Sequence, residues 1–207
     1  MSKTLIVTGC HKSYKTIYDL TIKSKRDWTD KWGYELLESK FEDGLHLGWT
    51  RLHLAIDMRA TDRWDRVIWL DADTIITNPR LPAPSTDHTA HISVSRDWHD
   101  NDPDDPDPKI PVSCGNFIVN RVDSHLQFVL EKEKRKAKHE QEVIRLLVNN
   151  PVPYVEIQVL PWYDLNPVPL ELRPNHNRSI WNPNHLLAHC TADCMDDRIK
   201  FIKSIHP

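Results

Sequence analysis

The sequence lacks a run of apolar residues long enough to span a membrane, and the apolar stretch near Met1 is too short for a signal peptide. We therefore expect a cytoplasmic protein with no membrane span. Only 4 cysteines occur, scattered among apolar and loop residues, which suits reduced thiols better than a disulfide framework. Cys190 and Cys194 follow His189, but a paired Cys-x-x-Cys is missing, which argues against structural zinc.

An excess of one charge sign is also lacking. The formal net charge is −3, and the one basic run, at 132–138, includes an acidic residue and is typical of an exposed helix face. A broad nucleic-acid-binding surface is therefore not expected. The chain has 207 residues, of which 39% are hydrophobic and 28% charged. This is an ordinary mixture for one domain with a sizeable core, which we expect to span 1–207.

Short apolar runs alternate along the chain with stretches of helical periodicity. Strands are predicted at 4–8, 34–38, 67–70, 92–95, 117–120, 155–160 and 186–189. Helices are predicted at 14–31, 49–60 and 139–148, and after a cap at Asp123 or Ser124. This order predicts an α/β fold, a single Rossmann-like domain with a mostly parallel central sheet flanked by helices. The acidic, proline-rich segment 98–109 is expected to be a flexible loop.

One apolar run ends in two carboxylates. Residues 67–79 read Val-Ile-Trp-Leu-Asp-Ala-Asp-Thr-Ile-Ile-Thr-Asn-Pro, so Asp71 and Asp73 follow a buried strand with one residue between them. Two such side chains point to the same side of an extended chain. At the end of a strand they would form an oxygen site for a divalent cation, which could in turn hold a diphosphate. Asp-x-Asp alone is a weak signal, because most such pairs lie on solvated turns.

Five segments in a fixed order raise the strength of that signal. They are Trp49–His53, Leu70–Thr74, Ser113–Asn120, Glu140–Glu142 and Leu160–Asn166, with His189 closing the set. In this order they resemble the GT-A-fold glycosyltransferases, especially glycogenin-like and related retaining sugar transferases. The chain departs from the family pattern at two points. The family usually has His-x-x-Gly with a lysine soon after, whereas here His189 leads to Ala192 and Lys200 lies further on. The acidic residue before Gln141 is Glu140, where the family more commonly has an aspartate.

The resemblance implies a metal site and a donor site. Asp71, Asp73 and His189 would hold Mn²⁺ or Mg²⁺, and the neutral imidazole would favour manganese. Asp73 and His189 should then face a common cleft, with their side chains within about 6 Å of each other. Contacts to a UDP- or GDP-linked sugar donor would come from Thr8, Gly9, Cys10, Arg51, Asp71 and Gly115.

By the same resemblance, the catalytic residues beside the sugar would be Glu140, Gln141 and Asp97. Simpler explanations stay open for several side chains. They are a packed core histidine for His189, a solvated helix charge for Arg51, a strand bulge for Gly115, a helix cap for Glu140 and a loop carboxylate for Asp97.

We therefore interpret the sequence as a metal-dependent glycosyltransferase that moves a hexose or pentose from a nucleoside diphosphate to an unknown acceptor. Retention of the anomeric configuration is implied by the resemblance. One alternative is a nucleotide-sugar-binding protein without turnover. Another is a phosphatase with an aspartate nucleophile in Asp-x-Asp-x-Thr/Val, but here Ile75 takes the last position and the motif lies in mid-chain.

Overall fold

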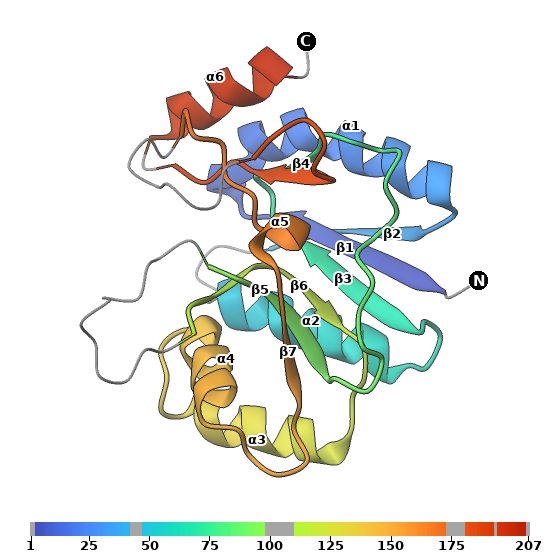
Figure 1. The fold of residues 1–207 in the computed structure, drawn as a ribbon, viewed down its shortest axis with the longest axis vertical. Coiled ribbons are helices and arrows are strands. Elements are labelled where there is room, and N and C mark those ends of the chain that lie inside the picture. The colour runs from blue at the N-terminus through green and yellow to red at the C-terminus, as the bar shows by residue number, and fades with distance from the viewer. Residues whose placement is uncertain (1–2, 42–46, 98–109, 173–180, 193, 206–207) are drawn as a thin grey trace.

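The computed structural model describes residues 3–41, 47–97, 110–172, 181–192 and 194–205. The predicted loop at 98–109 lies outside these described residues. Figure 1 shows the elements in chain order. The strands are β1 Thr4–Cys10, β2 Glu35–Lys40, β3 Arg66–Leu70, β4 Thr74–Ile76, β5 Ile92–Arg96, β6 Val112–Val119, β7 Ile157–Leu160 and β8 Leu187–His189. The helices are η1 Lys12–Tyr14, α1 Lys15–Trp32, α2 Leu47–Ala60, α3 Ser124–Lys134, α4 Glu140–Asn149, α5 Trp162–Leu165 and α6 Met195–Ile205.

A six-stranded sheet with the order β2-β1-β3-β6-β5-β7 forms the centre of the fold. The pairs β1–β2, β1–β3 and β5–β7 are parallel, whereas β6 is antiparallel to both of its neighbours. Five strands therefore run in one direction and β6 opposes them. The predicted α/β fold with a mostly parallel sheet is confirmed.

Each face of this sheet is covered by helices, and alternate residues of the strands enter different cores. On β1, Leu5 and Val7 belong to the core that includes buried residues of α2, α3 and α4, while Ile6 belongs to the core on the other side, with Trp28 of α1. Figure 1 shows the same division, with α2, α3 and α4 below the sheet and α1 and α6 above it. Because both faces are buried, the inner strands read as continuous apolar runs in the sequence.

Local chemistry sets the limits of two helices that matter below. Gly33 ends α1 in the left-handed conformation with φ 65°, which a residue without Cβ adopts at little cost. Asp123 caps α3, since its Oδ1 accepts hydrogen bonds from the N–H groups of His125 and Leu126 at 3.1 and 3.0 Å. The expected cap at Asp123 is thereby confirmed.

Several features differ from the sequence-based prediction. β4, η1 and α5 were not predicted, and β6 begins at Val112, before the predicted 117. The strand near 186–189 was expected in the central sheet, but among the described residues β8 pairs with β4 in a separate two-stranded antiparallel sheet. The prediction also missed α6, which packs against α1. Its alternating charges concealed the short apolar stripe of Phe201 and Ile202 that is buried. No helix in the described part of the chain has the length and apolar character needed to cross a membrane.

Candidate active site

A cavity of about 400 Å³ opens where several strands of the central sheet end, a size in the usual range for small-molecule sites. Gly9 and Cys10 come from the end of β1, and Asp71 follows β3. Asp97 follows β5, and Gln141 lies in the first turn of α4. In doubly wound sheets, ligands gather at this edge because loops and helix ends diverge there.

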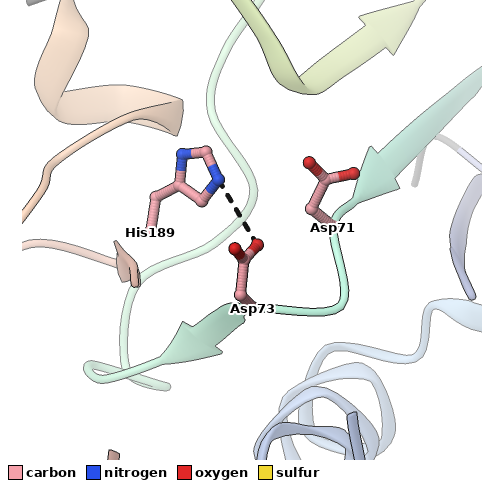
Figure 2. A group of neighbouring side chains, drawn as sticks. All are labelled: Asp71, Asp73 and His189. Carbon is pink, nitrogen blue, oxygen red and sulfur yellow. Dashed lines mark ion pairs between the residues drawn. The ribbon is translucent and has the colours of Figure 1, made fainter. Parts of the chain in front are cut away.

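Three potential metal ligands meet at the wall of this cavity. One ligand atom from each of Asp71, Asp73 and His189 lies within 4.8 Å of the others. His189 Nε2 is 3.4 Å from Asp73 Oδ1, inside the limit of about 6 Å expected for residues that share one ion. Figure 2 shows the two carboxylates and the imidazole directed toward one another from different segments. Asp73 and His189 are 6% and 7% exposed, so these two side chains are nearly shielded from bulk water, whereas Asp71 is partly buried.

The small sheet explains why residues so far apart in sequence meet. Thr74, the first residue of β4, pairs with His189, the last residue of β8. The N–H of Cys190 donates to the carbonyl of Asp73 at 2.9 Å, which continues the ladder past the end of the strand. The three candidate ligands thus come from the end of β3, the turn after it and the antiparallel partner of β4. Parallel strand ends alone do not form it, contrary to the expectation for His189.

Asn116 of β6 fixes the turn between the two aspartates. Its Oδ1 accepts hydrogen bonds from the N–H of Asp71 and the hydroxyl of Thr74, each at 2.9 Å. Its Nδ2 donates to the carbonyl of Leu165 at 2.7 Å. Asn116 is 1% exposed. The side chain therefore holds both ends of the Asp-x-Asp turn in place from the neighbouring strand.

The donor set fits a divalent cation of the manganese type, with two carboxylates and one imidazole. His189 Nδ1 lies 2.6 Å from Asn166 Oδ1, and an amide oxygen only accepts, so Nδ1 carries the hydrogen. In the neutral ring, Nε2 then presents its lone pair to the carboxylates. Burial alone would lower the pKa of His189, but the carboxylates of Asp73, Asp71 and Asp97 together outweigh burial and raise it.

Asn166 has a second relevant feature. Its Nδ2 is buried and has no hydrogen-bond partner among the described residues, although Asn166 lines the cavity. A buried amide donor without a partner is costly unless a ligand satisfies it. This atom is therefore available to a polar group of a bound molecule.

Arg51 of α2 links Asp71, one of the three candidate ligands, to Glu140 of α4. Its Nη1 donates to both oxygens of Asp71 at 2.6 and 2.8 Å, and its Nη2 donates to Glu140 Oε1 at 2.6 Å. The indole N–H of Trp69 also donates to Asp71 Oδ1 at 2.6 Å. Asp71 is thus fixed by two side chains. Arg51 is a partly buried ion-pair residue that also lines the cavity, and it is not a solvated helix charge.

Two cations near the aspartates, one buried and one partly buried, were not predicted. Lys25 of α1 is fully buried, and its Nζ donates to the carbonyl of Asp71 at 2.7 Å and to the hydroxyl of Thr8 at 3.1 Å. Burial lowers the pKa of Lys25 to about 8, against the opposing effect of the two aspartates. The signal in the sequence was its position on the apolar face of α1, four residues after Thr21 and three before Trp28.

The second unpredicted cation is Arg198 of α6, whose Nη1 donates to Asp73 Oδ2 at 2.8 Å. Arg198 lines the cavity and lies three and four residues before the buried Phe201 and Ile202. It therefore shares their face of the helix. The spacing of Arg198 from these two apolar residues can be recognised in the sequence. It points to the site only once α6 is known to pack beside it.

The structure brings most of the predicted site residues to the cavity wall: Gly9, Cys10, Arg51, Asp71, Asp73, Asp97, Gly115, Gln141 and His189. Thr8 and Glu140 lie behind that wall. Thr8 is fully buried and its hydroxyl donates to the carbonyl of Leu70 at 2.7 Å. Glu140 is 3% exposed and reaches the cavity only through Arg51. Direct substrate contacts from these two side chains are therefore not supported by their positions.

No model of a protein family matches the sequence, and no curated protein matches it. Solved structures do share the fold. A glycosyltransferase involved in glycosylation of the major capsid of PBCV-1 matches with a TM-score of 0.70 and 14% identity, over 98% of this chain and 99% of that chain. An active-site mutant of LgtC matches with a TM-score of 0.61 and 11% identity, over 97% and 94%. The galactosyltransferase LgtC with donor and acceptor sugar analogs matches with a TM-score of 0.55 and 13% identity, over 97% and 95%. The chain therefore has the GT-A fold of these glycosyltransferases, as the resemblance predicted.

Proposed function

We propose that this protein is a metal-dependent glycosyltransferase that moves a hexose or pentose from a uridine or guanosine diphosphate to an acceptor, with retention of configuration. The observation that carries the proposal is the convergence of Asp71, Asp73 and His189 within 4.8 Å at the wall of the cavity. The shared fold supports it, because the same architecture in LgtC holds donor and acceptor sugar analogs. A cytoplasmic location stays a prediction of the sequence.

Different parts of the cavity wall would contact the nucleoside, the metal ion and the sugar. Gly9 and Cys10 lie at the end of β1, where they would contact the nucleoside. Asp71, Asp73 and His189 would hold Mn²⁺ or Mg²⁺, which when bound supplies Lewis-acid stabilisation of the leaving diphosphate. Gln141 and Asp97 would lie beside the sugar, where an amide or carboxylate can stabilise positive charge at the anomeric carbon.

Glu140 takes a different role from the catalytic one first assigned to it. Its carboxylate is bonded to Arg51, and Arg51 in turn holds both oxygens of Asp71. We therefore assign Glu140 as a positioning residue that fixes Arg51, and through it the orientation of Asp71. Space for Glu140 depends on Gly48, because a Cβ at that position would lie 1.7 Å from Glu140 Oε2.

Calorimetry of nucleotide binding tests the proposal. UDP and GDP are titrated with Mn²⁺, with Mg²⁺ and after chelation, using the wild-type protein, Asp73→Asn and the control Asp62→Asn. Asp62 is 91% exposed and far from the cavity lining, so its substitution should leave binding unchanged. We expect at least one nucleotide to bind far more tightly with metal, and Asp73→Asn to lose that gain. Equal affinity after chelation would contradict the metal-dependent donor site.

Turnover separates the enzyme from its alternatives. Release of free nucleoside diphosphate from a bound nucleotide sugar is expected of a transferase, and its absence would favour a binding protein without turnover. The phosphatase alternative requires a free aspartate nucleophile. Both oxygens of Asp71 are held by Arg51, so this arrangement does not favour it.

A further inference from the structure

Arg198 is fixed at the cavity wall with one arm on a metal-ligating carboxylate. Its Nε donates to the carbonyl of Ala192 at 2.9 Å, and its Nη2 contacts the same carbonyl. Its Nη1 donates to Asp73 Oδ2 at 2.8 Å. The other oxygen of Asp73 faces His189 Nε2 at 3.4 Å. One oxygen of Asp73 is therefore already held by Arg198 before any ion is bound.

The charged side chains that contact one another at this site carry three negative and three positive charges. The negative charges are on Asp71, Asp73 and Glu140, and the positive ones on Arg51, Arg198 and Lys25. Asp97, which also lines the cavity, adds one negative charge. Adding a divalent cation to a nearly buried site leaves an excess of positive charge, which is unfavourable at low dielectric. Either one of the cations must move away from its carboxylate, or an anion must arrive with the metal.

Of the two arginines that line the cavity, Arg198 makes fewer hydrogen bonds to carboxylates, and its other bonds go to the carbonyl of Ala192. Lys25 is fully buried beneath the turn, and its ammonium group is held by a carbonyl and a hydroxyl. Arg51 makes two hydrogen bonds to Asp71 and a third to Glu140. Arg198 reaches Asp73 through Nη1 alone, and its guanidinium group lines the open cavity, 5.7 Å from the ring of Tyr14.

We propose that Arg198 competes with the divalent cation for Asp73, and that the diphosphate of the donor binds Arg198 once the metal releases it. This inference rests on the proposed function. A guanidinium fork suits two phosphate oxygens as well as it suits a carboxylate. Metal and nucleoside diphosphate should therefore bind cooperatively, because each removes the obstacle to the other. Arg198 would thus set the order and strength of donor loading.

The experiment measures Mn²⁺ binding by electron paramagnetic resonance of the free ion, with and without saturating UDP. Wild-type protein is compared with Arg198→Gln and with Lys203→Gln, which removes the same charge from an exposed position on the same helix. For Arg198→Gln we expect Mn²⁺ alone to bind about tenfold more tightly and UDP in the presence of Mn²⁺ to bind about tenfold more weakly, within the usual range of coupling between linked sites. Lys203→Gln should match the wild type.

Changes of opposite sign distinguish competition from simple damage to the site. The inference would be overturned if Arg198→Gln bound Mn²⁺ alone with the same affinity as the wild type, or with a lower one. If Arg198→Gln does not fold, Arg198→Lys takes its place. Arg198→Lys keeps the positive charge but loses the planar guanidinium group. The affinities for Mn²⁺ and for UDP should therefore change in the same directions as in Arg198→Gln, by a smaller factor. Failure of every variant and the wild type to bind Mn²⁺, even with UDP, would instead refute the metal dependence in the proposed function.

Discussion

Gly115 and His189 approach so closely that a Cβ on Gly115 would lie 2.5 Å from His189 Cε1. The same Cβ would lie 3.3 Å from Asp71 Oδ2. Gly115 therefore leaves the space that the side chains of two proposed metal ligands, His189 and Asp71, occupy. The register between β5 and β6 also shifts here, because Val94 pairs with Phe117 and Ser95 with Ser113. Gly115 therefore lies within the irregular stretch of β6, and the expected strand bulge accompanies this close approach.

Gly115→Ala should displace the imidazole and weaken Mn²⁺ binding at least about tenfold, since outer contacts that orient a ligand commonly carry such factors. Gly33→Ala is the matched control, because a Cβ there meets nothing within 4 Å but has the strained φ of 65°. That control should lose stability of about 1 kcal/mol and keep its metal affinity. Calorimetry with Mn²⁺ and thermal unfolding separate the two effects. Unchanged metal binding in Gly115→Ala would contradict the role given to His189.

Glu140→Ala should destabilise the protein, because the Arg51 guanidinium group would lose one of its two carboxylate partners in a partly buried site. The expected loss is about 3 kcal/mol, the lower end for breaking a buried ion pair. It should lower the unfolding midpoint by about 6–12 °C. Glu142→Ala, which removes an exposed carboxylate from the same helix, should change it little. A small shift for Glu140→Ala would show that solvent replaces the lost partner.

Asp123→Ala should cost about 1 kcal/mol at pH 7 by removing the cap of α3. Burial would raise the pKa of Asp123, but the Leu126 N–H, His91 and Arg121 outweigh it and hold the pKa below its ordinary value. A carboxyl with a depressed folded-state pKa stabilises the fold above its unfolded pKa of about 3.9, and this contribution is lost as the pH falls below it. The difference in free energy of unfolding between Asp123→Ala and the wild type, measured with denaturant, should therefore shrink as the pH falls from about 5 to about 3. This pH range brackets the unfolded-state pKa. Asp57→Ala, at an exposed position of α2, is the control.

Cys10 should be protected from thiol reagents by a bound nucleotide, since it lines the cavity at the end of β1. Partial burial raises the pKa of Cys10, so its labelling should be slow. The exposed Cys194 is first replaced by serine, while Cys114 and Cys190 are buried. Mass spectrometry should then show slower labelling of Cys10 when UDP and Mn²⁺ are present. Equal rates with and without nucleotide would remove Cys10 from the donor site.

Many of the strands and helices could be predicted from the sequence, because they depend on the local pattern of apolar and polar residues. The run at 67–70 is apolar on both faces, as expected for a strand covered by helices on both sides, and it forms β3. The helix before it forms α2 and carries Arg51 on a partly buried position. The pairing of β8 was not readable. A three-residue strand carries too little pattern to choose between the edge of the large sheet and β4, and tertiary packing made that choice.

The sequence by itself determined that Asp71 and Asp73 lie together at the end of a buried strand, because two residues one apart share a side of the chain. It also placed Gly115, Gln141 and His189 in order along the chain. Only the tertiary structure decided which charges meet those aspartates. Arg198 lies 125 positions from Asp73 and on a different element, and the ion pair exists because α6 packs against α1. A buried charge takes the partner that folding brings to it, and no local pattern encodes that partner.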